Sequence, residues 1–352
     1  MAFSSITKPS DYFNIKLYTG NGSTQSITGV GFQPDWVWIK DRIGSTSVYS
    51  HHLFDAIRGS TKYLLSNATD AEATEATTLT SFDSDGFSLG SDASTNASGD
   101  ATVSWNWLAA NGTAANSDGS ISSTVSANTT AGFSIVSWTG SGANATIGHG
   151  LGATPKMIFV KNRTDAINWQ VYSSMVGNTK AMFLDGTNTP DTGSFYWNDT
   201  TPTSSVFSVG TYNGTNGSSD NMIAYCFAEK QGYSKFGSYI GNGSAAGTFI
   251  YTGFKPAYFL TKSSSNGESW HIFDNQRENS YNPHSTIAPR VNDDSAESTN
   301  SNYEMDLISN GVKWNGLGDG VNASGYTYIY MAFAKEPFAA NDSGTGIPAT
   351  AG

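Results

Sequence analysis

The stretch of sequence that decides the fold is GFQPDWVWIK, residues 31–40. Its second half places Trp36 and Trp38 on one face of an extended chain and Val37 and Ile39 on the other. A strand that is apolar on both faces belongs in the middle of a packed sheet, where losing one large side chain costs a few kcal/mol. We therefore expect this stretch to contain a core strand.

The same stretch recurs twice more along the chain. Aligned on the proline, residues 153–161 read ATPKMIFVK and residues 253–262 read GFKPAYFLTK. In front of each copy stands a predicted strand that ends in a small turn, and the three turns read TGNG, TGSG and IGNG. The second residue of an Asn-Gly pair adopts a positive φ at low cost, so these turns are typical of hairpins. Such self-similarity predicts a repeat architecture.

Each copy also continues in the same order after its proline. A short aromatic segment follows, at residues 52–55, 169–172 and 270–274. A closing strand ends each copy, at residues 103–107, 223–227 and 329–333. Three anchors in one order predict three repeats of roughly 100 to 120 residues each, a size at which one β-sandwich buries a core.

Composition indicates the same fold class. Charged residues make up 13% of the 352 residues, about half of the usual share. Mixtures of Ala, Leu, Glu and Lys that favour helices are rare, whereas Thr, Tyr, Trp, Phe and Val are plentiful. We therefore predict an all-β protein of three tandem β-sandwich (jelly-roll-like) repeats.

The repeats also set the expected domain boundaries. We expect a first repeat with a short N-terminal anchor at residues 1–115, a linker at 116–131, a second repeat at 132–231, a third repeat at 232–338 and a C-terminal tail at 339–352.

The same composition argues against several partners. The formal net charge is −11 and Lys and Arg form no cluster, so we expect no binding to nucleic acid. No apolar run approaches the roughly 18 residues of a membrane helix, and the first residues do not resemble a signal peptide. Cys226 is the only cysteine, which excludes an intrachain disulfide and fits synthesis in a reducing cytoplasm.

Taken together, these stretches resemble a known family. The combination of YTGNG (residues 18–22), GFQPDWVWIK and SFDSDGF (residues 81–87) is similar to a repeated β-rich domain of uncharacterised function found in structural proteins of tailed bacteriophages. The likeness covers about residues 12–338 and is weakest in the second copy, where GLGATP replaces the Gly-Phe-x-Pro pattern. The resemblance implies a virion part, such as a tail fibre, baseplate appendage or head decoration, and transfers no catalytic residue.

One stretch matches a hydrolase motif. Residues 86–90 read GFSLG, which fits the Gly-x-Ser-x-Gly nucleophile elbow with Ser88 as the nucleophile. That elbow needs a helix directly after the serine, but the chain continues as SDASTN, and the third copy has Lys313 at the matching position. We interpret the match as chance in a chain rich in Gly and Ser, and we expect no enzyme. Paired carboxylates for glycan cleavage are a spatial property, so a depolymerase stays an alternative.

Metal-binding patterns are equally weak. The five histidines have no metal-ligand spacing, and we interpret them as ordinary surface or loop residues: His51, His52, His149, His271 and His284. The stretch DSDG at residues 83–86 resembles the start of a calcium loop, but the twelfth position holds Ser94 instead of Glu. An Asp-capped β-turn is the favoured interpretation. We expect no cofactor, with an irregular Ca²⁺ site in a polar loop as the alternative.

Six aromatic residues outside the repeated strands are the candidates for contact with a glycan or another partner: Tyr196, Trp197, Tyr212, Tyr281, Trp314 and Tyr326. The face of a pyranose stacks on an exposed ring, and polar loops supply hydrogen bonds. Lone aromatic residues also occur on surfaces that bind nothing, so this alternative stays open.

These observations predict a non-enzymatic virion structural protein, made in the host cytoplasm and working within a homo- or hetero-oligomeric assembly. We expect it to be tail-associated and to act in host adsorption, gaining avidity from several weak glycan contacts. The alternatives are a capsid decoration or head-fibre protein, a free lectin-like protein outside any virion and, less favoured, a glycan depolymerase. The sequence has no long shaft-like segment, heptad coiled coil or collagen-like run, which argues against a long tail fibre.

Overall fold

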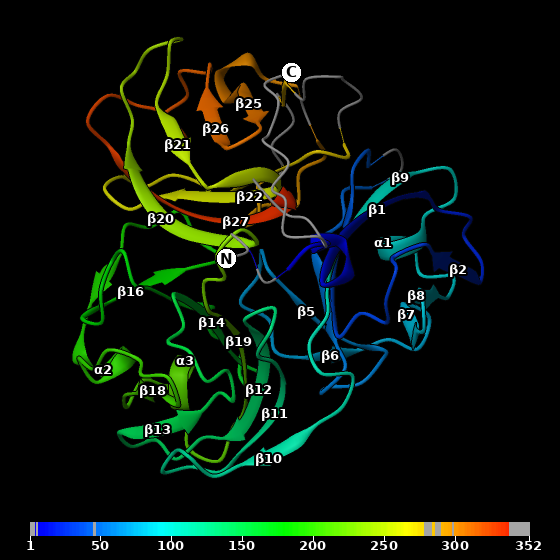
Figure 1. Ribbon diagram of the computed structural model, residues 1–352. Coiled ribbons are helices and arrows are strands. Elements are labelled where there is room, and N and C mark those ends of the chain that lie inside the picture. Colours follow the sequence, from blue (N-terminus) through cyan, green and yellow to red (C-terminus); the bar gives the residue numbers. More distant parts are fainter. Residues whose placement is uncertain are drawn as a thin grey trace.

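The computed structural model describes residues 4, 6–44, 47–277, 284–285, 290–297 and 299–337 (Figure 1). Regular structure in this part of the chain is almost entirely strand, in several separate sheets consistent with β-sandwich folds. The helices are single short turns: η1 (Pro9–Asp11), α1 (Ala93–Asn96), α2 (Ser194–Trp197), α3 (Asn213–Asn216) and η2 (Ser301–Tyr303). The predicted all-β fold class is therefore confirmed.

The first group of strands, which we call unit 1, builds two antiparallel sheets. The large sheet has the order β1-β9-β3-β4-β5-β6 and the small sheet the order β2-β8-β7. The strands are β1 (Phe13–Thr19), β2 (Gln25–Thr28), β3 (Trp36–Asp41), β4 (His52–Asp55), β5 (Lys62–Leu65), β6 (Ala73–Thr74), β7 (Leu79–Asp83), β8 (Gly86–Leu89) and β9 (Ala101–Trp107). The predicted core strand β3 lies inside the large sheet, between β9 and β4.

Unit 2 follows with a large sheet in the order β10-β11-β12-β19-β14-β15-β16-β17 and a small sheet β13-β18. Its strands are β10 (Ala114–Asn116), β11 (Ser123–Asn128), β12 (Phe133–Thr139), β13 (Ala145–Gly148), β14 (Met157–Asn162), β15 (Gln170–Ser173), β16 (Lys180–Phe183), β17 (Asp191–Thr192), β18 (Val206–Val209) and β19 (Asn221–Phe227). Part of the stretch expected to be a linker thus belongs to the sheet, because β11 pairs with β12.

Unit 3 has a large sheet in the order β20-β27-β22-β23 and a small sheet in the order β21-β26-β25-β24. Its strands are β20 (Ser234–Ile240), β21 (Phe249–Tyr251), β22 (Phe254–Ser263), β23 (His271–Asp274), β24 (His284–Ser285), β25 (Met305–Ile308), β26 (Gly311–Trp314) and β27 (Thr327–Pro337). Its large sheet repeats the strand order β1-β9-β3-β4 of unit 1 and β12-β19-β14-β15 of unit 2. We call residues of different units matching residues when they occupy the same place in corresponding strands or in the turns next to them.

Two kinds of core hold these sheets together. Three clusters of buried side chains each lie within one unit, between its large and small sheets, and Val37 and Ile39 belong to the cluster of unit 1. The largest cluster contains Trp36 and Trp38 and draws residues from all three large sheets, which meet at the centre of the molecule in Figure 1. The Trp36 ring, for example, stacks on Tyr225 of unit 2 with centroids 4.4 Å apart.

Each face of β3 packs into a different core, which explains why both faces are apolar. The central core crosses the domain boundaries drawn from the sequence, so those boundaries stay a prediction. None of the helices in the described part of the chain has the length and apolar character needed to cross a bilayer.

Candidate functional site

The structure places the six candidate aromatic residues in different environments. Three are buried in the sandwich cores of units 2 and 3: Tyr196, Trp197 and Trp314. Tyr212 and Tyr326 are half-buried, and Tyr281 lies outside the described residues. A ring without an exposed face cannot stack on a sugar, so of the five candidates that the structure describes only Tyr212 and Tyr326 offer part of a ring to solvent.

Tyr196 and Tyr212 meet in one aromatic cluster at the rim of unit 2. Their rings pack edge to face with centroids 5.1 Å apart, and the Phe195 ring lies 5.8 Å from Tyr212. The Tyr196 hydroxyl donates a hydrogen bond to Asp191 at 2.7 Å, and burial together with this carboxylate raises the pKa of Tyr196. Phe195, which the sequence did not single out, is the exposed member of the cluster.

Ser88 lies within β8 rather than on a strand-to-helix turn. Its hydroxyl donates a hydrogen bond to the Asp83 carboxylate at 2.6 Å and lies 3.0 Å from the Ser26 hydroxyl. The next helix begins only at Ala93. The serine therefore belongs to a hydrogen-bond network across three neighbouring strands, and the geometry lacks the strained turn that exposes a nucleophile.

The DSDG stretch forms a capped loop. The two carboxylate oxygens of Asp85 accept hydrogen bonds from the backbone N–H groups of Gly29, at 2.9 Å, and Gly31, at 2.7 Å. These bonds lower the pKa of Asp85. Both glycines have positive φ, where a side chain would be strained. Within the described residues no group of three His, Cys, Asp or Glu side chains could hold a metal ion.

The interpretation of the histidines as surface or loop residues was wrong for His52 and His271, which lie in β4 and β23, whereas His51 and His149 lie in loops but are buried there. His51, His52, His149 and His271 are buried, and the side chain of His284 lies outside the described part. His51 accepts a hydrogen bond from the Trp38 indole at 2.9 Å, and burial lowers its pKa well below the usual range. His51 is buried because the central core covers the face of β3 that carries Trp38, whereas His52 and His271 pack against rings of the sandwich cores of their own units.

His51 also marks a contact that recurs at each junction between units. Its Nε2 atom lies 3.0 Å from a backbone carbonyl of unit 3. The matching residues Trp169 and Trp270 donate from their indole nitrogens to backbone carbonyls of units 1 and 2, at 2.8 and 2.7 Å. Each unit thus contacts the backbone of the unit before it, in cyclic order.

Three matching lysines make a second cyclic contact. Lys40, Lys161 and Lys262 are buried at the ends of the central strands. Their ammonium groups donate to backbone carbonyl oxygens of the preceding unit at 3.0, 2.8 and 3.1 Å, on Asp294, Thr69 and Thr187. Burial lowers the pKa of all three, to about 8 for Lys161 and Lys262. The carbonyl oxygens replace the water that a buried ammonium group loses.

Buried charges strengthen the junction between units 1 and 2. The Asp55 carboxylate pairs with Arg58 and accepts a hydrogen bond from the Tyr225 hydroxyl of unit 2 at 2.6 Å. Glu72 lies 3.5 Å from Arg58 and pairs with Arg163 of unit 2 at 2.8 Å. The two units therefore share one hydrogen-bonded network of charges.

The junction between units 3 and 1 repeats this network. Asp274 pairs with Arg277 at 2.6 Å and accepts a hydrogen bond from the Trp105 indole of unit 1 at 3.0 Å. Glu297 pairs with Arg277 at 2.8 Å and with Arg42 of unit 1 at 2.7 Å. The residues match those of the first junction one by one.

The junction between units 2 and 3 lacks these charges at the matching positions. Ser173 and Val176 stand where the other units have an aspartate and an arginine, and Met331 stands where they have Tyr225 and Trp105. Val176 packs against the central core, which also contains Met331. This junction is therefore held by apolar packing at these positions.

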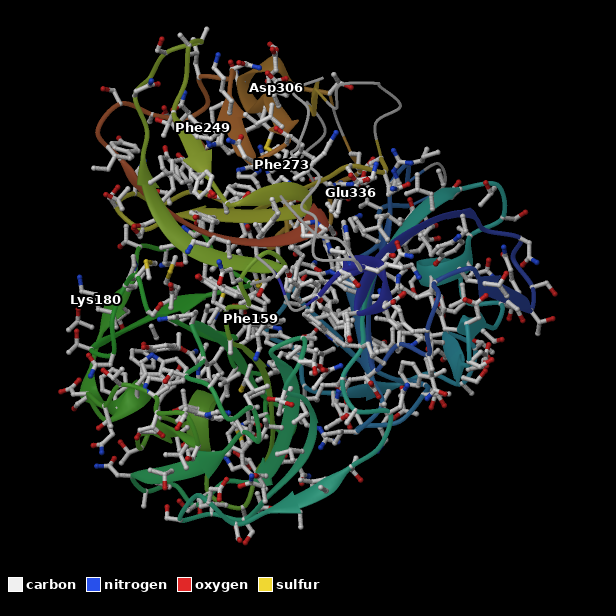
Figure 2. The ribbon with its side chains drawn as sticks, in the orientation of Figure 1. Phe159, Lys180, Phe249, Phe273, Asp306 and Glu336 are labelled. Atoms are coloured by element: carbon white, nitrogen blue, oxygen red, sulfur yellow. The ribbon has the colours of Figure 1, made fainter. Side chains whose placement is uncertain are left out.

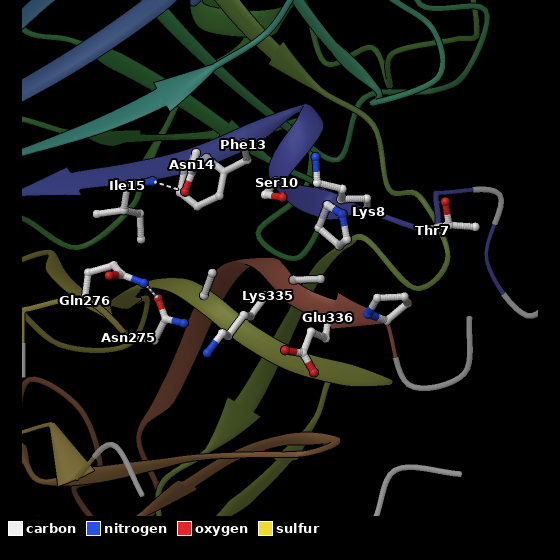
Figure 3. A pocket seen from close by; sticks show the side chains of 14 residues that line it. Thr7, Lys8, Ser10, Phe13, Asn14, Ile15, Asn275, Gln276, Lys335 and Glu336 are labelled. Carbon is white, nitrogen blue, oxygen red and sulfur yellow. Dashed lines mark hydrogen bonds between the residues drawn. The ribbon is translucent and has the colours of Figure 1, made fainter. Parts of the chain in front are cut away.

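A pocket of 320 Å³ lies between units 1 and 3 (Figure 3). One wall comes from η1 and the start of β1, and the other from β22, β27 and the residues after β23. Among the residues that line it, Phe13 and Ala257 are buried, whereas Lys335 and Glu336 are exposed. The pocket lies at the one junction that no linking segment of the chain crosses.

Three buried asparagines were also missed by the sequence reasoning. Asn96, Asn216 and Asn322 each stand before a closing strand, and each side-chain oxygen accepts the backbone N–H of a small turn. The donors are Asn21, Ser141 and Asn242, at 2.9, 3.1 and 3.1 Å. The recurring Asn-x-Ser at these three places was the available signal.

A family model matches residues 8–337, which is almost the whole described chain. The chain belongs to the DUF7483 family. The family is described as a domain of unknown function, and its model spans units 1, 2 and 3 as one domain, in agreement with the shared central core. A comparison with curated proteins found no match. The resemblance to a domain of uncharacterised function is confirmed to this extent, and the link to bacteriophages stays a prediction.

Proposed function

We propose that this DUF7483 protein is a non-enzymatic structural component of a tailed-bacteriophage virion, associated with the tail and used in adsorption to the host surface. The resemblance of the YTGNG, GFQPDWVWIK and SFDSDGF stretches motivates the virion. One observation of the structure supports it most: the three large sheets face inward onto one core, which leaves the small sheets and their loops on the outside.

A rigid body of this kind suits a virion part because such a part must keep its shape while its outer surfaces meet partners. The lysine and indole contacts bind each unit to the backbone of the unit before it, in a closed cycle. Loops on a rigid frame are well placed for recognition. We expect other virion proteins and a host-surface glycan as partners, and neither nucleic acid nor membrane insertion.

A capsid decoration or head-fibre protein is the second candidate. The observation that favours it is the arrangement of three units with one strand order around a common core, which approximates three-fold symmetry. Closed cyclic arrangements of like units are a common form of protein symmetry. Three-fold positions on a capsid shell would present a surface of matching symmetry.

Quantitative mass spectrometry of purified particles tests the proposal. A few to a few tens of copies per particle, relative to the major capsid protein, supports the tail role. Hundreds of copies favour the capsid decoration. Absence from particles contradicts both and favours the free lectin-like protein or the depolymerase, which turnover of host polysaccharide distinguishes.

A further inference from the structure

Unit 3 exposes an aromatic strip on the outside of its small sheet. Phe249 and Tyr251 on β21 are 47% and 54% exposed, and Ile240 at the end of β20 is 63% exposed. The residue between the two rings, Ile250, is buried in the sandwich core. Figure 2 shows Phe249 on β21, on the side of unit 3 away from the other units.

Units 1 and 2 have no rings at the matching positions. The register of the small sheets matches Phe249 and Tyr251 with Ser26 and Thr28 in β2, and with Thr146 and Gly148 in β13. Ile240 likewise matches Thr19 and Thr139. The fold therefore does not require apolar side chains here. An exposed apolar strip on an outer strand carries a risk of aggregation, so its presence in one unit points to binding.

The two rings are held against glycine backbone. A Cβ atom on Gly311 would lie 2.9 Å from the Phe249 ring, and one on Gly253 would lie 3.5 Å from the Tyr251 hydroxyl. Side chains two residues apart on a strand project about 7 Å apart on the same face, a spacing that suits neighbouring contacts with one or two sugar rings. The strip is therefore an open platform, with its two rings lying over glycine backbone.

Charged groups flank the rings on the same face. Lys313 lies directly opposite Phe249 in the register, and Asp306 lies directly opposite Lys313. Asn315 donates a hydrogen bond to Asp306 at 2.9 Å. Cross-strand partners project from the same face of a sheet, so the Lys313 cation lies beside the Phe249 ring and the Asp306 anion lies one strand farther along the same face. The residue matching Lys313 is a serine in both other units.

We propose that this face of unit 3 binds a saccharide of the host-cell surface through Phe249, Tyr251, Lys313 and Asp306. This inference rests on the adsorption part of the proposed function and assigns the contact to residues other than the six aromatic candidates. The charges argue for a saccharide over a protein, because the core of a protein interface is depleted of charge. A whole interface also covers about 800 Å² per partner. Three apolar side chains cover much less, whereas exposed rings beside a few polar groups suit hydroxyl-rich sugar rings.

An array of purified bacterial O-antigen and capsular polysaccharides tests the inference with the full chain. The variant is Phe249→Ser with Tyr251→Thr, which introduces the residues that unit 1 has at these positions. Ile43→Thr, at an exposed apolar residue of unit 1, is the control. We expect the wild type and the control to bind the same saccharides and the double variant to bind them at least about tenfold more weakly. Circular dichroism and thermal unfolding should be unchanged, because the replaced side chains are exposed.

Three outcomes would overturn the inference. They are no binding of the wild type to any saccharide on the array, equal binding by the double variant, and a change in self-association on sedimentation without a change in saccharide binding. The last result would make the strip an interface between copies of the chain. Mass spectrometry of particles separates this inference from the proposed function. If the chain is present in particles but binds no saccharide, only saccharide binding by the strip is refuted. If the chain binds a saccharide but is absent from particles, only the virion role is refuted.

Discussion

The junction between units 2 and 3 differs from the other two, although all three bring matching strands together. We call the junctions between units 1 and 2 and between units 3 and 1 the polar junctions. In each of them a buried aspartate and arginine contact a tyrosine hydroxyl or a tryptophan indole of the next unit. At the third junction Ser173, Val176 and Met331 occupy the matching places. Buried charges are costly unless every member has a partner, so the polar junctions demand a particular neighbour.

This difference gives three similar units a means of assembling in one order. If unit 3 took the place of unit 2 beside unit 1, Met331 would face Asp55, which would lose the hydrogen bond from Tyr225. A wrong neighbour thus leaves a buried polar group with fewer partners, which costs more than a loss of packing alone. Apolar packing at the third junction imposes no such condition.

The largest effect is expected from breaking a polar junction. Asp55→Ala leaves Arg58 buried beside fewer charges and Tyr225 without its acceptor, so we expect the free energy of unfolding to fall by about 3–5 kcal/mol. The matched change at the apolar junction, Ser173→Ala, should cost about 1 kcal/mol or less. Urea unfolding measures both, and equal losses would contradict the comparison.

The buried lysines are what all three junctions share, and they predict a pH dependence. Lys161 loses its proton near pH 8 in the folded protein but near its usual value of 10.5 when unfolded. The unfolded chain therefore binds more protons between these values, so the Lys161 contribution to the free energy of unfolding increases as the pH rises. From pH 8 to pH 10 we expect the Lys161 contribution to the free energy of unfolding to increase by about 2 kcal/mol.

Lys161→Met removes this titration while keeping a long side chain at the site. Urea unfolding at pH 7, 8, 9 and 10 should show that the wild type gains stability relative to the variant as the pH rises. The hydrogen bonds that the variant loses lower its free energy of unfolding by an amount that does not depend on pH. Parallel pH profiles for the two proteins would contradict the prediction.

Transplanting the apolar junction sharpens the comparison. The triple variant Asp55→Ser, Arg58→Val and Tyr225→Met gives units 1 and 2 the residues found at the junction of units 2 and 3. Because no charge is left without its partner, we expect a loss of less than about 2 kcal/mol, well below that of Asp55→Ala alone. Urea unfolding measures the free energy of unfolding of both variants. A triple variant less stable than Asp55→Ala would refute the role assigned to the charges.

The smallest effect is expected at the outer ion pairs of the polar junctions. Glu72 and Arg163 form two hydrogen bonds at 2.8 and 2.9 Å and are only partly exposed. Glu72→Gln should cost about 1 kcal/mol, and the loss should shrink only in part in 1 M salt, because partly buried charges are screened much less than exposed ones. Unfolding midpoints at low and high salt measure this loss, and a loss that vanishes in 1 M salt would show that the pair behaves as an exposed one.

Much of the fold could be predicted because it depends on local patterns. The alternation of β3 located a core strand, and Asp85 proved to cap a loop. The glycine turns located strand ends, but their prediction as hairpins was wrong: each turn links a strand of the large sheet to a strand of the small sheet, such as β1 to β2, and these two strands do not pair. The shared core could not be predicted, because two apolar faces indicate two contacts without saying which segment supplies the second. The buried Lys40 and His51 follow from that core and were missed for the same reason.

The candidate site was harder to predict than the fold. Trp197 and Trp314 lie outside the recurring sequence stretches, but both fill sandwich cores, because positions without sequence similarity also face inward. The exposed rings on β21 lie beside a recurring stretch and were passed over. Phe249 is unusual only beside Ser26 and Thr146, which occupy the matching positions in the folded units but not in an alignment of the recurring stretches.

The three units form one body around a shared core. Native-state hydrogen exchange of the closing strands β9, β19 and β27, measured by mass spectrometry in the wild type and in Asp55→Ala, tests it most directly. One body predicts a common opening free energy in all three strands, which the substitution lowers by the same amount in each. A loss confined to β9, with β19 and β27 unchanged, would show that the units unfold independently and would contradict the account.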